Sequence, residues 1–189
     1  MQAGSRPLRR FAILFAMRGE KTRLAKIEVS GRLPGGIGLR RAELRDAAAF
    51  FAERSASRVG VPFREVAVVL QGDAASAEVH RAINGADGAT DVVTQRYDAL
   101  PGEEPGVYGE LYVNCERAVA AATRRRGWSA AKELLLYVAH GMDHLSGADD
   151  LDERGYRAMR RRELRWISLM NHPVQDGLPG LIRHKPNMI

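Results

Sequence analysis

Two histidines, His140 and His144, stand four residues apart, so on an α-helix they lie about one turn from each other on the same face. Gly147 follows, and glycine can end a helix in a left-handed backbone conformation before the chain turns back to Asp150. Two imidazoles and one carboxylate are three protein ligands for zinc, with a fourth position open to water. Histidines at this spacing also occur on solvated helix faces, but the glycine and the carboxylate favour a metal site. Open zinc sites catalyse hydrolysis, because the metal lowers the pKa of its bound water to about 7.

The segment that carries the histidines has the pattern of an amphipathic helix, which we predict over residues 130–146. Ser129 is suited to cap its N-terminus. Apolar residues recur at helical spacing along one side: Leu134, Leu135, Val138, Met142 and Leu145. The two histidines fall on the opposite side, near Leu136 and Tyr137, and we expect this half-apolar face to form the wall of a cleft.

Several carboxylates near the motif are candidates for proton transfer. Metalloproteases of the HExxH type use the residue after the first histidine as general base, and Gly141 at that position disfavours a protease. Asp149 and Glu110 are the catalytic candidates, although Asp149 fits better as a group that orients a ligand histidine. Glu110 fits equally well as a charge at a strand end. We expect Asp143 to be solvated and Glu163 to pair with a buried cation.

Residues 140–150, HGMDHLSGADD, resemble the signature HGxLHLxGYDH of the YbeY family of bacterial rRNA maturation factors. The positions in common are His140, Gly141, His144, Leu145, Gly147 and Asp149. Residues 90–93 are similar to the family's TDVLSF segment, and residues 109–113 to its GDIxI strand. Met159 and Glu163 fit an M…E pattern in the last helix. The resemblance covers roughly residues 60–170.

Members of this family are single-domain, zinc-dependent endoribonucleases, and the resemblance implies the same fold and activity for this chain. It implies one zinc ion per chain and a partner in rRNA or the small ribosomal subunit. In two places the sequence departs from the family pattern. Asp150 takes the place of the third histidine, which is compatible with zinc because carboxylate oxygens are acceptable ligands. The family's YR pair, whose arginine is associated with catalysis, has no counterpart in residues 85–89 (GADGA).

Helix and strand patterns alternate without a strict βαβ rhythm, which favours a single α+β domain. Strand-like runs are residues 24–29, 66–70, 91–94 and 110–113. Helix-like runs are residues 41–58, 74–83, 116–126, 130–146 and 153–170. We expect a mixed sheet of about four strands with packed helices and the metal site on a central helix. Residues 21–170 would form this domain, with residues 1–20 as an N-terminal extension or extra strand and residues 171–189 as a C-terminal tail.

Composition narrows the class of protein. The apolar fraction of 45% is typical of a globular domain and fits a chain of 189 residues with one core. A single cysteine, Cys115, excludes an internal disulfide and is consistent with a reducing compartment, so we expect a cytoplasmic protein. No run approaches the ~20 apolar residues that span a membrane, so no membrane partner is expected.

The charge pattern suggests a basic surface for a polyanion, because both ends of the chain are basic and the middle is acidic. The RNA-binding candidates are Arg124, Arg125 and Arg126 before the metal helix, and Arg157, Arg161 and Arg165 on one ridge of the last helix. Phosphate contacts need only clustered positive charge. The alternatives are a solvated helix face for the ridge and cations that complement a helix dipole for the triplet. If neither set contacts RNA, the next candidates are Arg40, Arg41 and Arg45.

Three functions stay open at this level. The first is a metal-dependent endoribonuclease of rRNA maturation, in which zinc-activated water hydrolyses RNA phosphodiesters. The second is a zinc-containing ribosome-assembly or RNA-binding factor without catalysis, which the missing YR pair favours. The third is a metallohydrolase of another substrate. Three ligands with an open fourth position favour the first.

Overall fold

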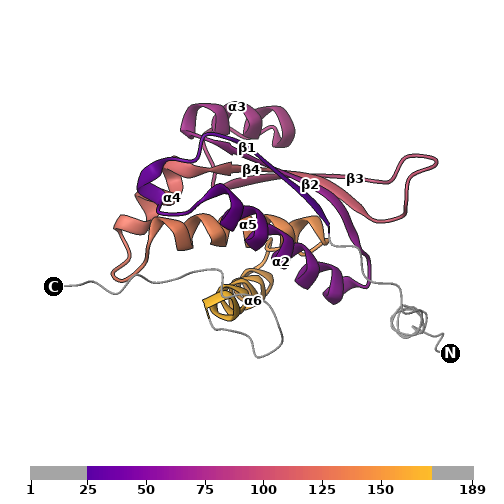
Figure 1. Cartoon of the computed structure of the whole chain (residues 1–189). Helices are drawn as coiled ribbons and strands as arrows, with labels where there is room; N and C mark the ends of the chain where they lie inside the picture. The colour runs from indigo at the N-terminus through magenta and orange to yellow at the C-terminus, as the bar shows by residue number, and fades with distance from the viewer. Residues whose placement is uncertain (1–24, 172–189) are drawn as a thin grey trace.

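A four-stranded mixed sheet is the framework of the domain (Figure 1). The computed structural model describes residues 25–171. The strand order is β1-β2-β4-β3, in which β1 (Lys26–Gly31), β2 (Phe63–Gln71) and β4 (Val107–Asn114) are parallel. The edge strand β3 (Val92–Tyr97) pairs antiparallel with β4. The predicted α+β class and the four-stranded mixed sheet are therefore confirmed.

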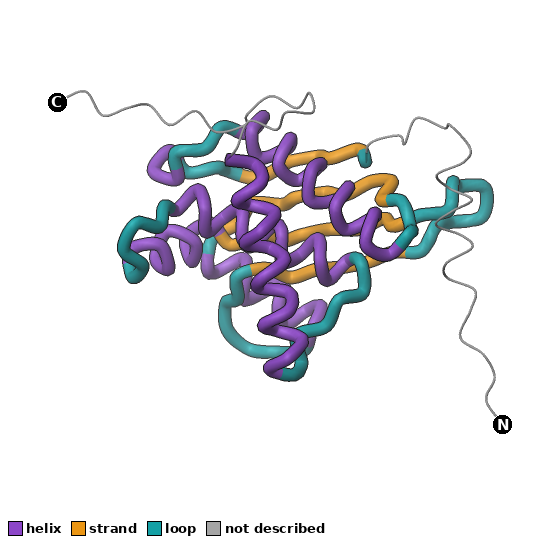
Figure 2. The backbone as a smooth tube through the Cα atoms, turned by 90° about the horizontal axis from the view of Figure 1, so that it is seen from below, coloured by secondary structure: helices purple, strands orange, loops and turns teal. Residues whose placement is uncertain are grey.

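Helices cover both faces of this sheet. Figure 1 shows α3 on one face, α2 and α5 on the other, and α6 outside them. Seen from below, α6 crosses in front of the layer that contains α2 and α5 (Figure 2). The bounds are α2 (Arg41–Val59), α3 (Asp73–Asn84), α4 (Cys115–Thr123), α5 (Ala130–Leu145) and α6 (Glu153–Asn171), with a short 3-10 helix, η1, at Gly35–Ile37.

Helix α5 lies at the centre of the core. The residues of its predicted apolar side are all buried: Leu134, Leu135, Val138, Met142 and Leu145. Leu136 and Tyr137 are buried as well, so the part of the helix before the histidines is enclosed on every side and forms no cleft wall. This expectation was wrong because the sheet, α2, α4 and α6 all pack on the same helix. The Ser129 cap is confirmed, since its side chain accepts the Lys132 N–H at 3.2 Å.

Several element boundaries differ from the predicted ones. The β3–β4 ladder runs from Val92 opposite Val113 to Tyr97 opposite Tyr108, so both strands extend through polar residues that backbone pairing holds in place. Helix α4 ends at Thr123 instead of residue 126. No helix among residues 25–171 is long and apolar enough to cross a membrane. The predicted extension at residues 1–20 and the tail lie outside the described residues, except that Asn171 ends α6.

Candidate metal centre

Gly141 sets the rotation of α5 against the sheet. A Cβ atom there would come within 2.7 Å of a Leu111 methyl group and 3.2 Å of Val92, so this position requires glycine for close packing. The residue faces β3 and β4, while His140 and His144 lie on the adjoining flank of the helix. A glutamate in place of Gly141 would point into the sheet, so the HExxH arrangement of a protease does not fit this helix.

The end of α5 is a glycine-terminated turn, as the sequence predicts. Gly147 has a φ of 82°, and its N–H donates to the His144 carbonyl at 2.8 Å. The next N–H, from Ala148, donates to the Asp143 carbonyl at 3.1 Å, which completes a Schellman motif. This reversal sends the chain back along the helix and brings Asp150 to the two histidines.

The loop that carries Asp150 rests on the first turn of α6. A Cβ atom at Gly155 would come within 2.5 Å of the Asp149 carbonyl oxygen, so the loop can approach this closely only because Gly155 has no side chain. The Asp152 side chain accepts the Gly155 N–H at 2.5 Å and caps the helix. Backbone packing of α6 therefore positions the third candidate ligand.

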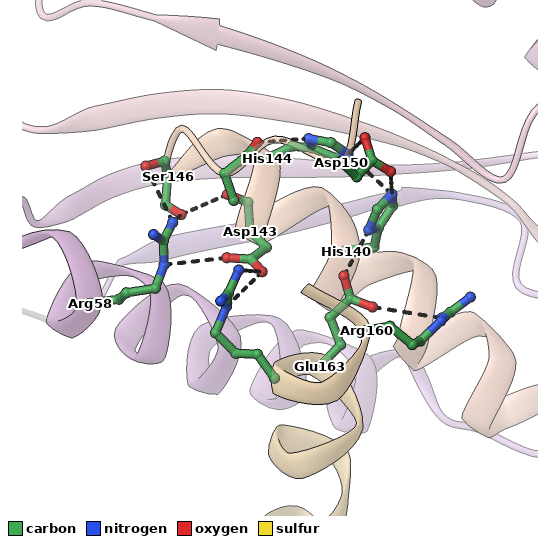
Figure 3. Close-up of polar contacts among 10 residues, drawn as sticks. Arg58, His140, Asp143, His144, Ser146, Asp150, Arg160 and Glu163 are labelled. Carbon is green, nitrogen blue, oxygen red and sulfur yellow. Dashed lines mark hydrogen bonds and ion pairs between the residues drawn. The ribbon is translucent and has the colours of Figure 1, made fainter. Parts of the chain in front are cut away.

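The three candidate ligands converge (Figure 3). The Nε2 atoms of His140 and His144 are 3.1 Å apart, and the Asp150 carboxylate oxygens lie 3.6 Å from the first and 3.7 Å from the second. Ligands bound to zinc at about 2.0–2.2 Å in a tetrahedron lie about 3.4 Å from one another. Within residues 25–171, the His, Cys, Asp and Glu side chains that lie close enough together to hold a metal ion are His140, His144 and Asp150.

The opposite ring nitrogens fix the tautomer of both histidines. His140 Nδ1 contacts the Glu163 carboxylate at 2.7 Å, and His144 Nδ1 contacts the Ala148 carbonyl at 3.1 Å. Both partners are acceptors, so each Nδ1 carries a proton and donates. In a neutral ring the lone pair is then on Nε2, which faces the other ligands. Such a partner on the second nitrogen is the usual support of a metal-binding histidine, and the three residues fit a zinc ion.

The surroundings of His140 favour positive charge. Burial of the imidazole opposes its protonation, but the hydrogen bond to Glu163 and the charges of Glu163, Asp91 and Asp150 outweigh burial and raise the pKa of His140. Asp91 belongs to the TDV-like segment at the start of β3, and sequence reasoning gave it no role. The same carboxylates that favour a proton on His140 also favour a metal cation at this place.

Asp143 is not solvated, contrary to the expectation from sequence. Its side chain is fully buried, with Oδ2 2.5 Å from Arg162 Nη2. Figure 3 shows Arg58 on its other side, with Nε 3.4 Å from Oδ1. Arg58 also donates to the Ser146 hydroxyl. This cluster joins α2, α5 and α6 directly behind the histidines. Only the packing of α2 and α6 on α5 reveals it, because the spacing in α5 alone places Asp143 away from the apolar side.

Glu163 takes the histidine-orienting role that was expected of Asp149. Glu163 is 1% exposed and approaches the half-buried Arg160 at 3.6 Å, but its closest partner is His140. Asp149 accepts the Leu151 N–H within the loop and is exposed, so it orders the loop and orients neither histidine. Glu163 is a charged residue within the apolar stripe of α6. This pattern was the signal in the sequence that pointed to a special role for it.

Glu110 lies outside the site. Gly109 and Leu111 face α5, so the alternation of a β-strand turns Glu110 to the other face of the sheet. There Oε2 accepts hydrogen bonds from Tyr97 at 3.0 Å and from Tyr112 at 2.6 Å. The carboxylate raises the pKa of Tyr112 to about 12 through this hydrogen bond and, with burial, keeps the phenol protonated. The structure therefore does not support a catalytic role, and Glu110 is a structural charge inside β4 instead of at a strand end.

The two arginine sets lie at different ends of α5. Residues 124–126 precede α5, and Arg125 is held by Glu133 at 3.1 Å and stacks over Trp128. The ridge of Arg157, Arg161 and Arg165 is exposed on α6, which packs at the histidine end. Sequence reasoning missed Arg96, whose guanidinium donates to the Leu145 carbonyl at 3.1 Å, one residue beyond His144.

The fold and the site together define an α+β protein with a candidate two-histidine, one-carboxylate metal centre. The family model described as "Endoribonuclease YbeY" matches residues 40–171, which include α2 to α6 and all three candidate ligands. The chain belongs to this family.

Curated relatives support the same assignment. The "Endoribonuclease YbeY" of an Anaeromyxobacter species is 30% identical over 157 residues, which cover 82% of this chain and 78% of that protein. The protein of that name from a Thermotoga species is 32% identical over 121 residues, 61% of this chain and 77% of its own. A solution structure from Thermotoga maritima aligns with 82% of this chain and 98% of its own at 22% identity, with a TM-score of 0.49.

Proposed function

We propose that this protein is a zinc-dependent endoribonuclease that acts in rRNA maturation. Family membership supports the reaction class. The observation that carries the proposal is the convergence of two histidine Nε2 atoms and the Asp150 carboxylate, while both Nδ1 atoms are already engaged. His140, His144 and Asp150 would hold the ion. Bound zinc would supply an electrophile that activates water and polarises a phosphoryl oxygen.

The residues around the ligands provide orientation and charge. Glu163 and the Ala148 carbonyl hold the two imidazole rings, and Gly155 admits the loop that presents Asp150. Arg96 would take the place of the cation that the loop at residues 85–89 lacks, because its guanidinium binds the Leu145 carbonyl at the end of α5 that carries His144. We place a substrate phosphate against its remaining N–H donors. The expected substrate is rRNA of the small ribosomal subunit, in the cytoplasm.

A ribosome-assembly factor without catalysis is the second function. One observation favours it: the loop between α3 and β3 contains no arginine in place of the family's YR pair. In that case zinc would serve as a structural element that ties the Asp150 loop to α5.

The test is incubation of the zinc-loaded protein with structured rRNA fragments, with and without a chelator. We expect cleavage that the chelator removes and that His144→Ala abolishes. Glu133→Gln is the matched control, because Glu133 is also a buried polar side chain of α5 but lies at the other end of the helix. Tight binding without cleavage would select the assembly factor. If the protein neither binds nor cleaves the RNA, the nuclease and the assembly factor are both overturned, and a metallohydrolase of another substrate remains.

A further inference from the structure

A groove of about 580 Å³ lies between α2 and α6, on the flank of α6 away from Glu163. Four arginines line it: Arg54 from α2, and Arg161, Arg162 and Arg165 from α6. Its floor is apolar and includes Trp166 and Leu169. Two helices that are distant in sequence therefore bring four guanidinium groups to one concave surface that contains no carboxylate.

Within the part of the chain that the structure describes, most of this positive charge has no ion-pair partner. Among residues 25–171, the ion pairs involve only Arg162 of these four, through Asp143. Elsewhere on α6, Arg157 pairs with Glu153 and Arg160 approaches Glu163. A solvated helix face usually mixes both signs of charge, as that part of α6 does. Unpaired arginines that converge from two helices indicate a surface for a polyanion.

We propose that this groove binds the phosphodiester backbone of the RNA strand that the metal centre cleaves. The planar guanidinium fork suits phosphate oxygens. Trp166 is 6% exposed, which leaves no aromatic face for a base to stack on. The groove therefore contacts backbone and carries no base specificity. The inference rests on the proposed function, since it takes RNA as the substrate.

A second groove adjoins the first toward the N-terminal end of α6, which follows the loop of Asp150. Arg161 lines this second, smaller groove of about 210 Å³ together with Arg154, Arg157 and Glu153, which pairs with Arg157. This groove reaches the first turn of α6, three residues after Asp150. Arg162 also lines the large groove, and its guanidinium donates to Asp143 on α5. Asp143 lies between the two histidines in the sequence. The same helix thus carries the RNA track on one flank and Glu163, the partner of His140, on another.

The test compares two triple variants of the full chain that lose the same charge. Arg54→Gln with Arg161→Gln and Arg165→Gln removes the exposed groove cations and spares Arg162. Arg32→Gln with Arg81→Gln and Arg117→Gln removes three exposed arginines outside it. Binding of two single-stranded RNAs of unrelated sequence is measured by fluorescence anisotropy across a series of KCl concentrations, with thermal melting as the folding check.

We expect the groove variant to lose at least tenfold in affinity for both RNAs. The slope of log K against log salt should decrease in magnitude by about 2, because each of the three lost phosphate contacts contributes roughly 0.7. The matched variant should retain nearly the wild-type affinity and slope. Equal losses in both variants would assign binding to overall charge and overturn the proposal. Wild-type behaviour of the groove variant, or absence of RNA binding by the wild type, would overturn it as well.

Two further arms separate this inference from the proposed function. His144→Ala should abolish cleavage and leave RNA binding and its salt slope unchanged. Groove-dependent binding without cleavage by the wild type would refute the nuclease and retain the groove. Polyglutamate that displaces RNA at equal charge concentration would assign the groove to acidic polypeptides instead.

Discussion

At the scale of single residues, each ligand of the candidate centre depends on one neighbour. Glu163 holds His140, the Ala148 carbonyl holds His144, and Gly155 leaves room for the loop of Asp150. Of these neighbours, only Glu163 acts through a side chain. A buried carboxylate that accepts from a ligand histidine raises the basicity of that ligand and fixes the ring.

Replacement of Glu163 therefore tests the centre without touching a ligand. We predict that Glu163→Gln lowers zinc affinity about 10- to 100-fold, because the amide keeps the shape but loses the charge that polarises His140. The measurement is competition with a chromophoric chelator. Glu133→Gln should lower stability through Arg125 but leave zinc affinity at the wild-type value. Equal zinc affinity of Glu163→Gln and the wild type would show that Glu163 has only a packing role.

At the scale of elements, two glycines decide how α5 and α6 approach their neighbours. Gly141 allows α5 to pack on β3 and β4, and Gly155 allows the ligand loop to lie on α6. Neither glycine has a positive φ. Glycine is therefore required there by the close approach of neighbouring atoms and not by backbone conformation.

The substitution Gly155→Ala separates helix propensity from loop placement. Alanine favours a helix by up to about 1 kcal/mol over glycine, so α6 itself should gain stability. The added methyl group would meet the Asp149 carbonyl, displace the loop and lower zinc affinity about tenfold by moving Asp150. Metal titration followed by calorimetry measures this effect, and Ser168→Ala on the exposed side of α6 controls for propensity. Unchanged zinc affinity would refute the positional role of Gly155.

At the scale of the whole molecule, the Arg58–Asp143–Arg162 cluster ties three helices together beneath the sheet. The carboxylate is fully buried, while the arginine side chains are 32% and 26% exposed. Removal of one partner from a buried charge cluster leaves the others uncompensated.

We predict that Asp143→Asn lowers the free energy of unfolding by about 3 kcal/mol, at the low end for buried pairs because the arginines reach solvent. Thiol labelling at pH 8 can measure it. Burial, followed by the charge of Glu116, raises the pKa of Cys115 to about 11, so the native thiol is unreactive and labelling reports unfolding. Asp46→Asn, which removes an exposed carboxylate 3.9 Å from Arg45, should change little. A loss below about 1 kcal/mol would mean that the cluster does not hold the helices.

The sequence alone determined what depends on local chemistry and spacing. The pattern HxxxH with Gly147 and Asp150 predicted the helix, its left-handed end and the three side chains that converge, because helix geometry and glycine conformation are local properties. Strand and helix periodicity predicted the four strands and the α+β class. The metal itself and the RNA-binding arginines remain predictions.

Only the tertiary structure decided what surrounds the motif. Asp143 received its role from Arg58 and Arg162 on two other helices, and Glu110 received its role from tyrosines on the far face of the sheet. Glu163 reached His140 from 23 residues away along the chain, and Arg96 reached the Leu145 carbonyl from 49 residues away. Helical spacing gives the direction of a side chain from its own axis, but burial, charge partners and hydrogen bonds depend on which elements pack against that axis.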